Sequence, residues 1–375
     1  MDTRIISSDS HVIEPPDLWT SRIEPGLKDH APHVVSEDSG DWWYIEGQRT
    51  NSFQGGTQAG VRFERPEDLK MGGAWEDVRP GSFLPDARIK DLELDGVYGE
   101  VIYPTEGLLV YNARDNALLS AICRTYNDWI AEFCQDFPDR LKGIAMINVD
   151  EPAEAAQELR RARQLGLVGA MITVYPPDSM SYDRPVHNPF WATAQDLDIP
   201  LSLHIATGRP GPGQEFQDPT NVRPAFFATA DHWVRVSLAH MIFSGVFERF
   251  PKLKVVSVEH ELAWVPHFLD LLDYTYTQRA PRGPGWQKFK GDLLPSDMFR
   301  RNVCLSFQED GRGIKDRATI GVDNLMWGSD YPHTESTFPR SRQILDHILA
   351  DVSEEEKASI SGGNAARLYN FAFTT

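Results

Sequence analysis

The sequence predicts an α/β fold, a (β/α)8 TIM barrel in which residues 1–375 form a single domain with a β-hairpin and loop insertion after the first strand. Eight short segments are almost continuously apolar, as are strands buried on both faces of a parallel sheet. Each is followed by a helical segment, which favours right-handed crossovers between parallel strands. A doubly wound open sheet is the alternative, but no glycine-rich phosphate loop follows any of these strands.

The expected elements alternate regularly along the chain. We expect strands over residues 4–11, 96–104, 141–149, 167–174, 199–204, 252–260, 302–308 and 324–330. Helical periodicity between them predicts helices over residues 88–94, 114–137, 151–165, 188–197, 225–250, 263–276, 339–350 and 354–369. Pro152 stands in the first turn of one helix, where its missing N–H costs no hydrogen bond.

Residues 31–85 differ in composition from the rest of the chain. Residues 41–49 alternate aromatic and polar side chains up to a glycine turn, which predicts a small β-hairpin. Paired glycines and several prolines follow, as is typical of an ordered but irregular loop. We interpret this segment as an insertion over the barrel mouth, and we expect it to select substrate together with the 205–224 loop.

Composition and charge narrow the classes of partner. Lys and Arg total 37 against 55 Asp and Glu, a net charge of −18, which argues against nucleic acid and anionic membranes as partners. No apolar run approaches the length of a membrane span, and the N-terminus lacks the apolar region of a signal peptide. Because Cys123, Cys134 and Cys304 are widely spaced in apolar surroundings, we expect reduced thiols in a cytoplasmic protein.

The last expected strand ends in a carboxylate. Leu325 to Trp327 suit a buried strand, and Gly328 permits a close approach of the backbone just before Asp330. Pro332 then prevents the strand from continuing. A buried Asp must be paired, hydrogen-bonded or bound to a metal, because an isolated buried carboxylate is costly. For this residue alone, a structural Asp that caps the following helix is the alternative.

Polar residues also end three other expected strands. They are Asp9 and His11 in the first, His204 in the fifth, and Glu259 and His260 in the sixth. Alternate residues of a strand share a face, so Asp9 and His11 point the same way. Histidines and aspartates from separate strands, meeting at the C-terminal mouth of a barrel, would form an N/O site suited to zinc, manganese or iron.

Several motifs in a fixed order carry a family resemblance. The chain resembles the amidohydrolase-2 branch of the amidohydrolase superfamily, which includes aminocarboxymuconate semialdehyde decarboxylase and the resorcylate-type decarboxylases. The matching segments are Asp9-Ser-His-Val-Ile-Glu-Pro15, Asn188-Pro-Phe-Trp191, Pro200-Leu-Ser-Leu-His204, Gly245-Val-Phe-Glu-Arg-Phe-Pro-Lys-Leu-Lys-Val255, Trp264-Val-Pro266, Trp327-Gly-Ser-Asp-Tyr-Pro-His333 and Gly363-Asn-Ala-Ala-Arg-Leu-Tyr369.

The resemblance implies a metal site and names its residues. It assigns the metal ligands to Asp9, His11, His204 and Asp330, and an acid/base or substrate-orienting role to His260. The better-known decarboxylases have His or Glu where this chain has Asp9, which leaves the identity of the metal open. Residues 167–174 contain no lysine, so the carbamylated lysine of binuclear hydrolases is missing. We therefore expect one divalent ion, with zinc as the first expectation and manganese or iron as alternatives. A carboxylate such as Glu259 or Glu14 bridging two ions is the other possibility.

The implied activity is cleavage of a C–N or C–C bond in a small carboxylate or carbonyl substrate, by a metal-dependent hydrolase or a non-oxidative decarboxylase. His260 and Asp330 are the expected catalytic residues. The alternatives are an iron- or manganese-dependent oxygenase on the same scaffold and a non-catalytic binding subunit. We also expect a homo-oligomer, a dimer or larger. Further candidates for substrate contacts or for groups that support the ligands are Glu14, Glu259, Glu309 and His333.

Overall fold

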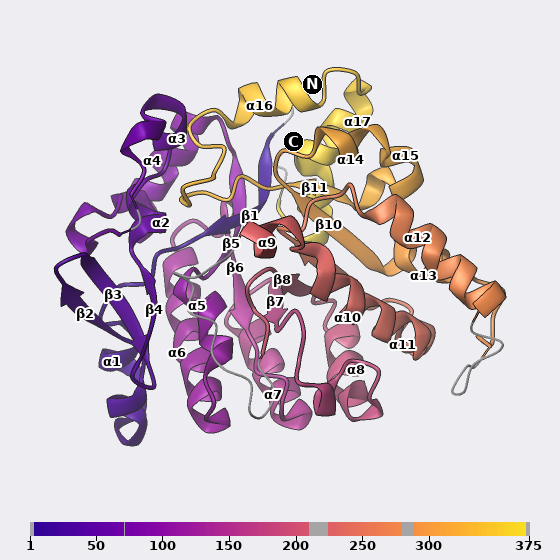
Figure 1. The fold of residues 1–375 in the computed structure, drawn as a ribbon, viewed down its shortest axis with the longest axis horizontal. Coiled ribbons are helices and arrows are strands. Elements are labelled where there is room, and N and C mark those ends of the chain that lie inside the picture. The colour runs from indigo at the N-terminus through magenta and orange to yellow at the C-terminus, as the bar shows by residue number, and fades with distance from the viewer. Residues whose placement is uncertain (1–3, 71, 210–223, 280–287, 373–375) are drawn as a thin grey trace.

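Eight parallel strands form one sheet that curves nearly into a closed barrel (Figure 1). The computed structural model describes residues 4–70, 72–209, 224–279 and 288–372. In sheet order the strands are β1 (Ile6–His11), β5 (Gly99–Tyr103), β6 (Leu141–Met146), β7 (Gly169–Ile172), β8 (Leu201–His204), β9 (Val255–Val258), β10 (Val303–Phe307) and β11 (Leu325–Trp327). The order follows the chain, as consecutive β/α units require, so the predicted barrel is confirmed.

The first strand and the segment after the last strand meet at the seam of the barrel. The N–H of Asp330 donates to the carbonyl of Asp9 at 2.9 Å, and the N–H of His11 donates to the carbonyl of Tyr331 at 2.6 Å. Ser8 Oγ adds a hydrogen bond to the carbonyl of Trp327 at 3.0 Å. These bonds bring the two ends of the sheet together, so residues more than three hundred positions apart in the sequence become neighbours.

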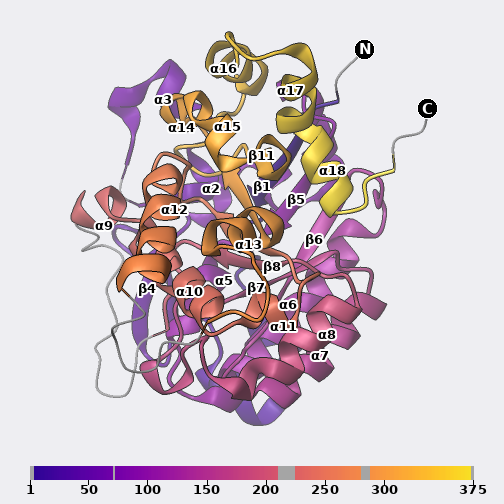
Figure 2. The same cartoon turned by 90° about the vertical axis from the view of Figure 1, so that its right-hand side faces the viewer.

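Helices surround the strands. Figure 1 shows α6, α7 and α8 on one side of the barrel and α16 and α17 on the opposite side, and in Figure 2 α12 and α13 face the viewer. The main helices are α4 (Pro85–Asp95), α6 (Asn116–Cys134), α7 (Pro152–Gln164), α8 (Asn188–Asp196), α10 (Asp231–Phe243), α12 (Val265–Tyr274), α13 (Pro295–Asn302) and α16 (Ser341–Ile348). Shorter ones are α1 (Leu18–Arg22), α5 (Glu106–Leu109), α9 (Pro224–Ala228), α11 (Val246–Arg249), α14 (Gly311–Lys315), α15 (Arg317–Ile320), α17 (Glu354–Ala358) and α18 (Asn364–Leu368).

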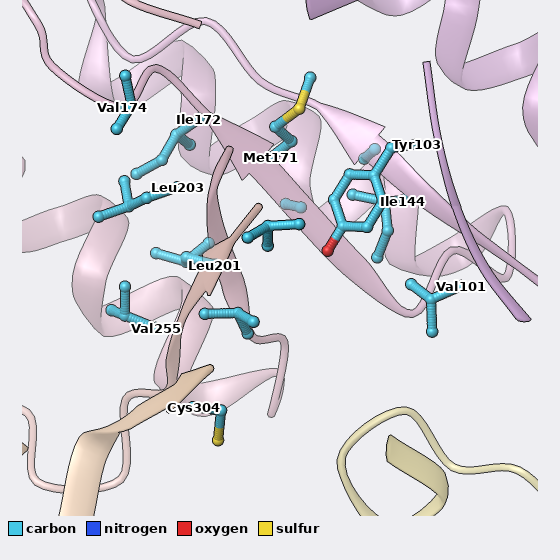
Figure 3. Packing of buried hydrophobic residues seen from close by; sticks show 14 of the residues in the cluster. Val101, Tyr103, Ile144, Met171, Ile172, Val174, Leu201, Leu203, Val255 and Cys304 are labelled. Carbon is cyan, nitrogen blue, oxygen red and sulfur yellow. The ribbon is translucent and has the colours of Figure 1, made fainter. Parts of the chain in front are cut away.

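The strands are buried on both faces. Every residue of β7, β8 and β9 is buried, which explains why these segments are mostly apolar in the sequence. Figure 3 shows part of this packing, in which side chains such as Val101, Ile144, Met171 and Leu203 crowd together. A close-packed barrel of this kind holds the strand ends in fixed positions, and the strand ends carry the polar residues of interest.

The insertion after β1 contains three antiparallel strands where the sequence predicts a two-stranded hairpin. The hairpin of β3 (Gly40–Ile45) and β4 (Gln48–Ser52) is present, and β2 (His33–Glu37) adds a third strand. Glu46 and Gly47 form the turn with φ of 49° and 76°, the backbone that a two-residue hairpin requires. A Cβ at Gly55 would lie 3.2 Å from His333 Cδ2, so the insertion packs against the end of the barrel that carries Asp330.

Several predicted boundaries need correction. The helix expected over 225–250 is three helices, α9, α10 and α11, and Gly245 with φ of 72° separates the last two. The strand expected over 252–260 ends at Val258, because Glu259 has φ of 62° and cannot continue a strand. The strand expected over 324–330 ends at Trp327, so Asp330 lies in the turn beyond it.

Two further expectations concern loops and membranes. Residues 210–223 of the loop expected to select substrate lie outside the described residues. Among the helices in the described part of the chain, none combines the length and the apolar character that crossing a bilayer demands.

Candidate metal centre

The four residues predicted as metal ligands lie together where the barrel strands end. Asp9 and His11 belong to β1, His204 is the last residue of β8, and Asp330 follows β11. Asp9 Oδ1 lies 3.4 Å from His11 Nε2 and 3.5 Å from His204 Nε2. His11 Nε2 also lies 3.4 Å from Asp330 Oδ1. None of these side chains is more than 5% exposed, so the group is shielded from solvent.

The backbone of β1 and β11 sets the direction of the aspartates. The pairing of β1 with β5 shifts register between Ser7 and Ser10, an irregularity of the kind that redirects side chains beside active sites. Gly328 brings the chain after β11 against Asp9, since a Cβ there would lie 2.6 Å from Asp9 Cβ. The close approach that the sequence predicts at Gly328 is therefore an approach to Asp9 itself.

The histidine rings present lone pairs to Asp9. His11 Nδ1 lies 2.7 Å from the carbonyl of Pro104, and His204 Nδ1 lies 3.0 Å from the carbonyl of Ile205. A carbonyl oxygen only accepts, so each Nδ1 carries a hydrogen, and the neutral form of such a ring has its lone pair on Nε2. Asp9 Oδ1, both Nε2 atoms and Asp330 Oδ2 are buried without a hydrogen-bond partner among the described residues, whereas Asp330 Oδ1 lies 2.8 Å from His333 Nδ1. These atoms are hydrogen-bond acceptors that face one another with no proton between them. Together they can donate electron pairs to a cation, so they fit a metal ion.

Burial and the neighbouring groups shift the pKa values of Asp9 and His11. Burial alone would raise the pKa of Asp9, but the contacts with His11 and His204 outweigh it and hold that pKa well below its usual value. Burial, with a smaller contribution from His333, lowers the pKa of His11 to about 3. Asp9 is therefore ionised and His11 neutral near neutral pH, which are the protonation states of metal ligands.

Asp330 lies between His11 and His333. His333 Nδ1 approaches Asp330 Oδ1 at 2.8 Å, and its Nε2 lies 2.9 Å from Thr105 Oγ1. The His333 ring stacks on His11 with centroids 4.1 Å apart. Burial, and then the charges of Glu335 and Asp9, raise the pKa of Asp330. Asp330 also has φ of 58°, an unfavourable conformation of the kind that clusters at functional sites.

Glu259 reaches the same group of side chains from the turn after β9. Its Oε2 lies 3.8 Å from His204 Nδ1, and it offers a carboxylate oxygen to the group of Asp9, His11 and His204. Burial, and then the charges of Asp330 and Asp9, raise the pKa of Glu259 well above its usual value. Glu259 is thus placed as a candidate fifth ligand.

His260 is buried beside this group and does not join it. Its Nδ1 lies 3.1 Å from Ser257 Oγ, while Nε2 is buried without a hydrogen-bond partner among the described residues. Burial, and then the charge of His204, lower the pKa of His260 to about 3. His260 is therefore a neutral imidazole with one nitrogen held by Ser257 and the other available.

Glu14 and Glu309 have other partners. The Glu14 carboxylate accepts the backbone N–H groups of Thr105, Glu106 and Gly107 at 3.3, 3.0 and 2.9 Å, so it binds the start of α5. Burial raises its pKa to about 7 although these hydrogen bonds oppose the rise. Glu309 forms an ion pair with Arg62 of α3 (Val61–Glu64), which ties the insertion to the end of β10.

Residues outside the sequence prediction complete the surroundings. Glu335, beyond the motif around Asp330, lies with Glu259 and Asp330 in a group of three carboxylates. Arg88 of α4 is fully buried and donates from Nη1 to the carbonyl of His11 at 2.7 Å. Arg88 and Glu335 give no sequence signal, since one lies mid-helix and the other in a turn, and only the fold brings them to the site.

A sequence model of the amidohydrolase family matches residues 75–371. The gamma-resorcylate decarboxylase of Polaromonas sp. (strain JS666 / ATCC BAA-500) is 25% identical over 316 residues, covering 79% of this chain and 90% of that protein.

Solved structures agree with the barrel. An amidohydrolase from Mycobacterium avium subsp. paratuberculosis K-10 superposes with a TM-score of 0.81 at 21% identity, over 100% of both chains. A dihydroxybenzoic acid decarboxylase from Polaromonas sp. JS666, with bound manganese and the inhibitor 2-nitroresorcinol, gives a TM-score of 0.64 at 19% identity, over 98% of this chain and 97% of that one. Since the family model spans most of the sequence, the chain belongs to the amidohydrolase family, a family of enzymes, as the sequence resemblance predicts.

Proposed function

We propose that this protein is a non-oxidative decarboxylase that removes CO2 from a small aromatic carboxylate, with a divalent metal ion held by Asp9, His11, His204 and Asp330. The observation that carries the proposal is the set of buried nitrogen and oxygen atoms that face one another without a hydrogen-bond partner among the described residues. The named activity of the Polaromonas relative supports decarboxylation over other reactions of the family.

The proposed metal is manganese, with zinc as the alternative. The sequence makes zinc the first expectation, and two imidazoles with two carboxylates accommodate either ion. Carboxylate-rich donor sets suit the harder manganese, and Glu259 adds a further carboxylate to this one. The Polaromonas decarboxylase structure contains bound manganese, which supports the choice of manganese over zinc.

The side chains have distinct proposed roles. When bound, a divalent ion supplies Lewis-acid chemistry toward the oxygen atoms of the substrate. His260 Nε2, which no described residue engages, takes up a proton from solvent and delivers it to the carbon that bears the carboxylate. As that C–H bond forms, the C–C bond to the carboxylate breaks, CO2 leaves, and its electron pair returns to the ring. Ser257 holds the other nitrogen of the imidazole and so orients the ring.

Hydrolysis of a C–N bond is the competing prediction, since the same side chains would serve it. The experiment is to load the protein with Mn2+ and incubate it with a panel of hydroxybenzoates and, separately, with matched aromatic amides and esters. We expect CO2 release from at least one hydroxybenzoate. In D2O the product should carry one deuterium at the carbon that lost the carboxylate. Hydrolysis of an amide or ester with no CO2 release would overturn the proposal.

The metal requirement is tested on the same samples. Removing the ion with a chelator should abolish CO2 release, and adding Mn2+ back should restore it. An oxygenase would consume dioxygen during turnover, so an oxygen electrode should record no consumption if the proposal holds. A protein that binds no ion and turns over no substrate would favour the non-catalytic alternative.

A further inference from the structure

We propose that His333 is a positioning residue that holds Asp330 for the metal ion, and that Thr105 in turn orients His333. This inference rests on the proposed function, because it takes Asp330 to be a ligand. In this arrangement His333 Nδ1 donates its hydrogen to Asp330 Oδ1, and Oδ2 is the oxygen left for the ion. The insertion after β1 takes part as well, since it packs against the His333 ring.

Asp330 and His333 are close enough to share a hydrogen. Asp330 Oδ1 lies 2.8 Å from His333 Nδ1, which is a hydrogen-bond distance. The angle of the contact lies outside the hydrogen-bond range, so a rotation of either side chain is needed to complete the bond. Two acceptors at this distance would repel each other, so a hydrogen must lie between them. A carboxylate that binds a cation is ionised, and the hydrogen then belongs to Nδ1.

Thr105, just after β5, engages the other nitrogen of the ring. Its Oγ1 lies 2.9 Å from His333 Nε2. A threonine hydroxyl can donate as well as accept, so it can supply the hydrogen to Nε2 when Nδ1 carries the hydrogen of the neutral ring. Thr105 thereby supports the tautomer whose Nδ1 donates to Asp330, and it fixes the ring from the far side.

Thr105 is itself held at the start of α5. Its backbone N–H donates to Glu14 Oε2 at 3.3 Å. The next two backbone N–H groups, of Glu106 and Gly107, donate to the same carboxylate at 3.0 and 2.9 Å. Glu14 is 1% exposed, so these hydrogen bonds are shielded from solvent. A group that orients another is effective only when its own surroundings fix it, and Glu14 fixes Thr105 in this way.

The ring of His333 is held on other sides as well. It stacks on His11 with centroids 4.1 Å apart and ring planes inclined by 27°. From the insertion, Gly55 approaches the edge of the ring, where a Cβ would lie 3.2 Å from Cδ2. The backbone N–H of His333 also donates to the carbonyl of Asp330 at 2.9 Å. The barrel and the insertion therefore fix this ring together, beside the proposed ligand.

The arrangement leaves one Asp330 oxygen for the ion. Oδ2 is buried and has no hydrogen-bond partner among the described residues. Residues that orient a metal ligand in this way contribute to the affinity for the metal without touching it. Their loss usually costs about ten- to a hundred-fold in affinity or activity. The role proposed for His333 is therefore measurable as a dissociation constant.

The test measures Mn2+ affinity, which does not depend on turnover. The full-length protein is stripped with a chelator and titrated with Mn2+, and the unbound ion is followed by electron paramagnetic resonance. We expect His333→Leu to raise Kd by about ten- to a hundred-fold. His333→Asn keeps an amide donor near the position of Nδ1 and should recover part of this loss. Thr105→Val keeps the shape of the side chain, removes the hydroxyl, and should raise Kd by a smaller factor.

A double variant tests whether the two residues act in series. Because Thr105 acts through His333, Thr105→Val should add little to the Kd of His333→Leu. His187→Leu is the matched control. His187 is also fully buried, with Nε2 2.7 Å from the carbonyl of Met180, and it belongs to none of the groups of described residues that could hold an ion. Its Kd should equal that of the parent protein. Urea denaturation with chelator measures the stability of each variant separately from Kd.

The outcomes separate this inference from the proposed function. An unchanged Kd in His333→Leu would overturn the inference and leave the metal centre standing. Complete loss of the ion, as expected in His204→Ala, would make His333 a ligand and overturn it as well. Equal Kd values for His333→Asn and His333→Leu would contradict the role of the donor, and additive effects in the double variant would contradict the role of Thr105. The expected Kd values without any CO2 release would instead overturn the decarboxylase and support this inference.

Discussion

Two groups of buried charged side chains lie next to each other in this barrel, and only one of them contains an arginine that pairs with its carboxylate. Arg88 and Glu100 form an ion pair in which both side chains are fully buried. Arg88 also donates to the carbonyls of His11 and Tyr331, at 2.7 and 3.4 Å. Asp9 and Asp330 are almost as deeply buried, but no arginine or lysine pairs with them in the described part of the chain.

The difference separates a charge pair that supports the fold from the carboxylates that we propose as metal ligands. A buried charge is tolerated when a partner within the chain compensates it, as Glu100 is compensated by Arg88. Asp9 faces the Nε2 atoms of His11 and His204, and Asp330 contacts only histidines among the cationic residue types, so we propose that a metal ion compensates these carboxylates. Arg88 joins the two groups, because it binds the carbonyls of His11, a candidate ligand, and of Tyr331, which follows Asp330. The contrast is therefore testable by substitutions on either side of it.

The largest effect is expected on the uncompensated side, at Asp330. Asp330→Asn keeps the shape of the side chain, and Asn tolerates the φ of 58°. We expect activity to fall below detection and metal content to drop, while the free energy of unfolding of the metal-free protein stays the same or rises. Activity assays, elemental analysis and urea denaturation measure these three quantities. An unfolded variant would instead make Asp330 a structural residue.

His260 should show a large loss of turnover without a loss of metal. In His260→Asn we expect the rate to fall by roughly a hundred- to ten-thousand-fold, the usual contribution of general acid–base catalysis. The ion should stay, because His260 Nε2 is not among the atoms grouped around Asp9. Rate and metal content are measured on one sample. A parallel loss of both would make His260 a ligand, and full activity would remove it from the mechanism.

On the compensated side, the effect should fall on stability. Arg88→Met leaves Glu100 buried without its partner, which should cost about 3–5 kcal/mol of unfolding free energy. Adding Glu100→Leu to the same chain removes the uncompensated charge and should recover much of that loss. Urea denaturation of the two variants gives the comparison. If Arg88→Met alone were as stable as the parent protein, the ion pair would contribute nothing to the stability of the fold.

Adding metal should have the smallest effect, a gain in the stability of the native state. This gain should depend on the proposed ligand residues. At a free Mn2+ concentration of a hundred times Kd, the native state should gain about 2.7 kcal/mol, because the ion binds the folded chain and not the unfolded one. Thermal unfolding with Mn2+ and with chelator measures the gain. Asp9→Asn should reduce it strongly. An equal gain in that variant would place the ion at other residues.

The sequence predicts the barrel well because its strands are buried on both faces. The mostly apolar runs at β7, β8 and β9 are a direct consequence of that burial. The boundaries are less predictable, since a single residue with positive φ ends an element. Glu259 ends β9 in this way, and Gly245 separates α10 from α11.

The candidate site is likewise predictable from the sequence only in part. Asp9, His11, His204 and Asp330 are predictable because each stands at or just beyond the end of an apolar run, and the barrel brings such ends together. Glu335 is not predictable from the sequence, because its place beside Asp330 depends on the path of a turn that hydrogen bonds from Gln308 and Arg62 hold. Sequence position also made Glu14 a candidate for the site, whereas its carboxylate binds the backbone at the start of α5.

The most direct test of the contrast between the two buried groups is a crystal structure of the protein loaded with Mn2+, with the ion located by anomalous scattering. We predict an ion in contact with Asp9 Oδ1, His11 Nε2, His204 Nε2 and Asp330, with His260 unligated and the Arg88–Glu100 pair unchanged. Anomalous density only on exposed carboxylates, with Asp9 and both Nε2 atoms still unengaged, would contradict the account. Those buried atoms would then need an explanation other than a metal ion.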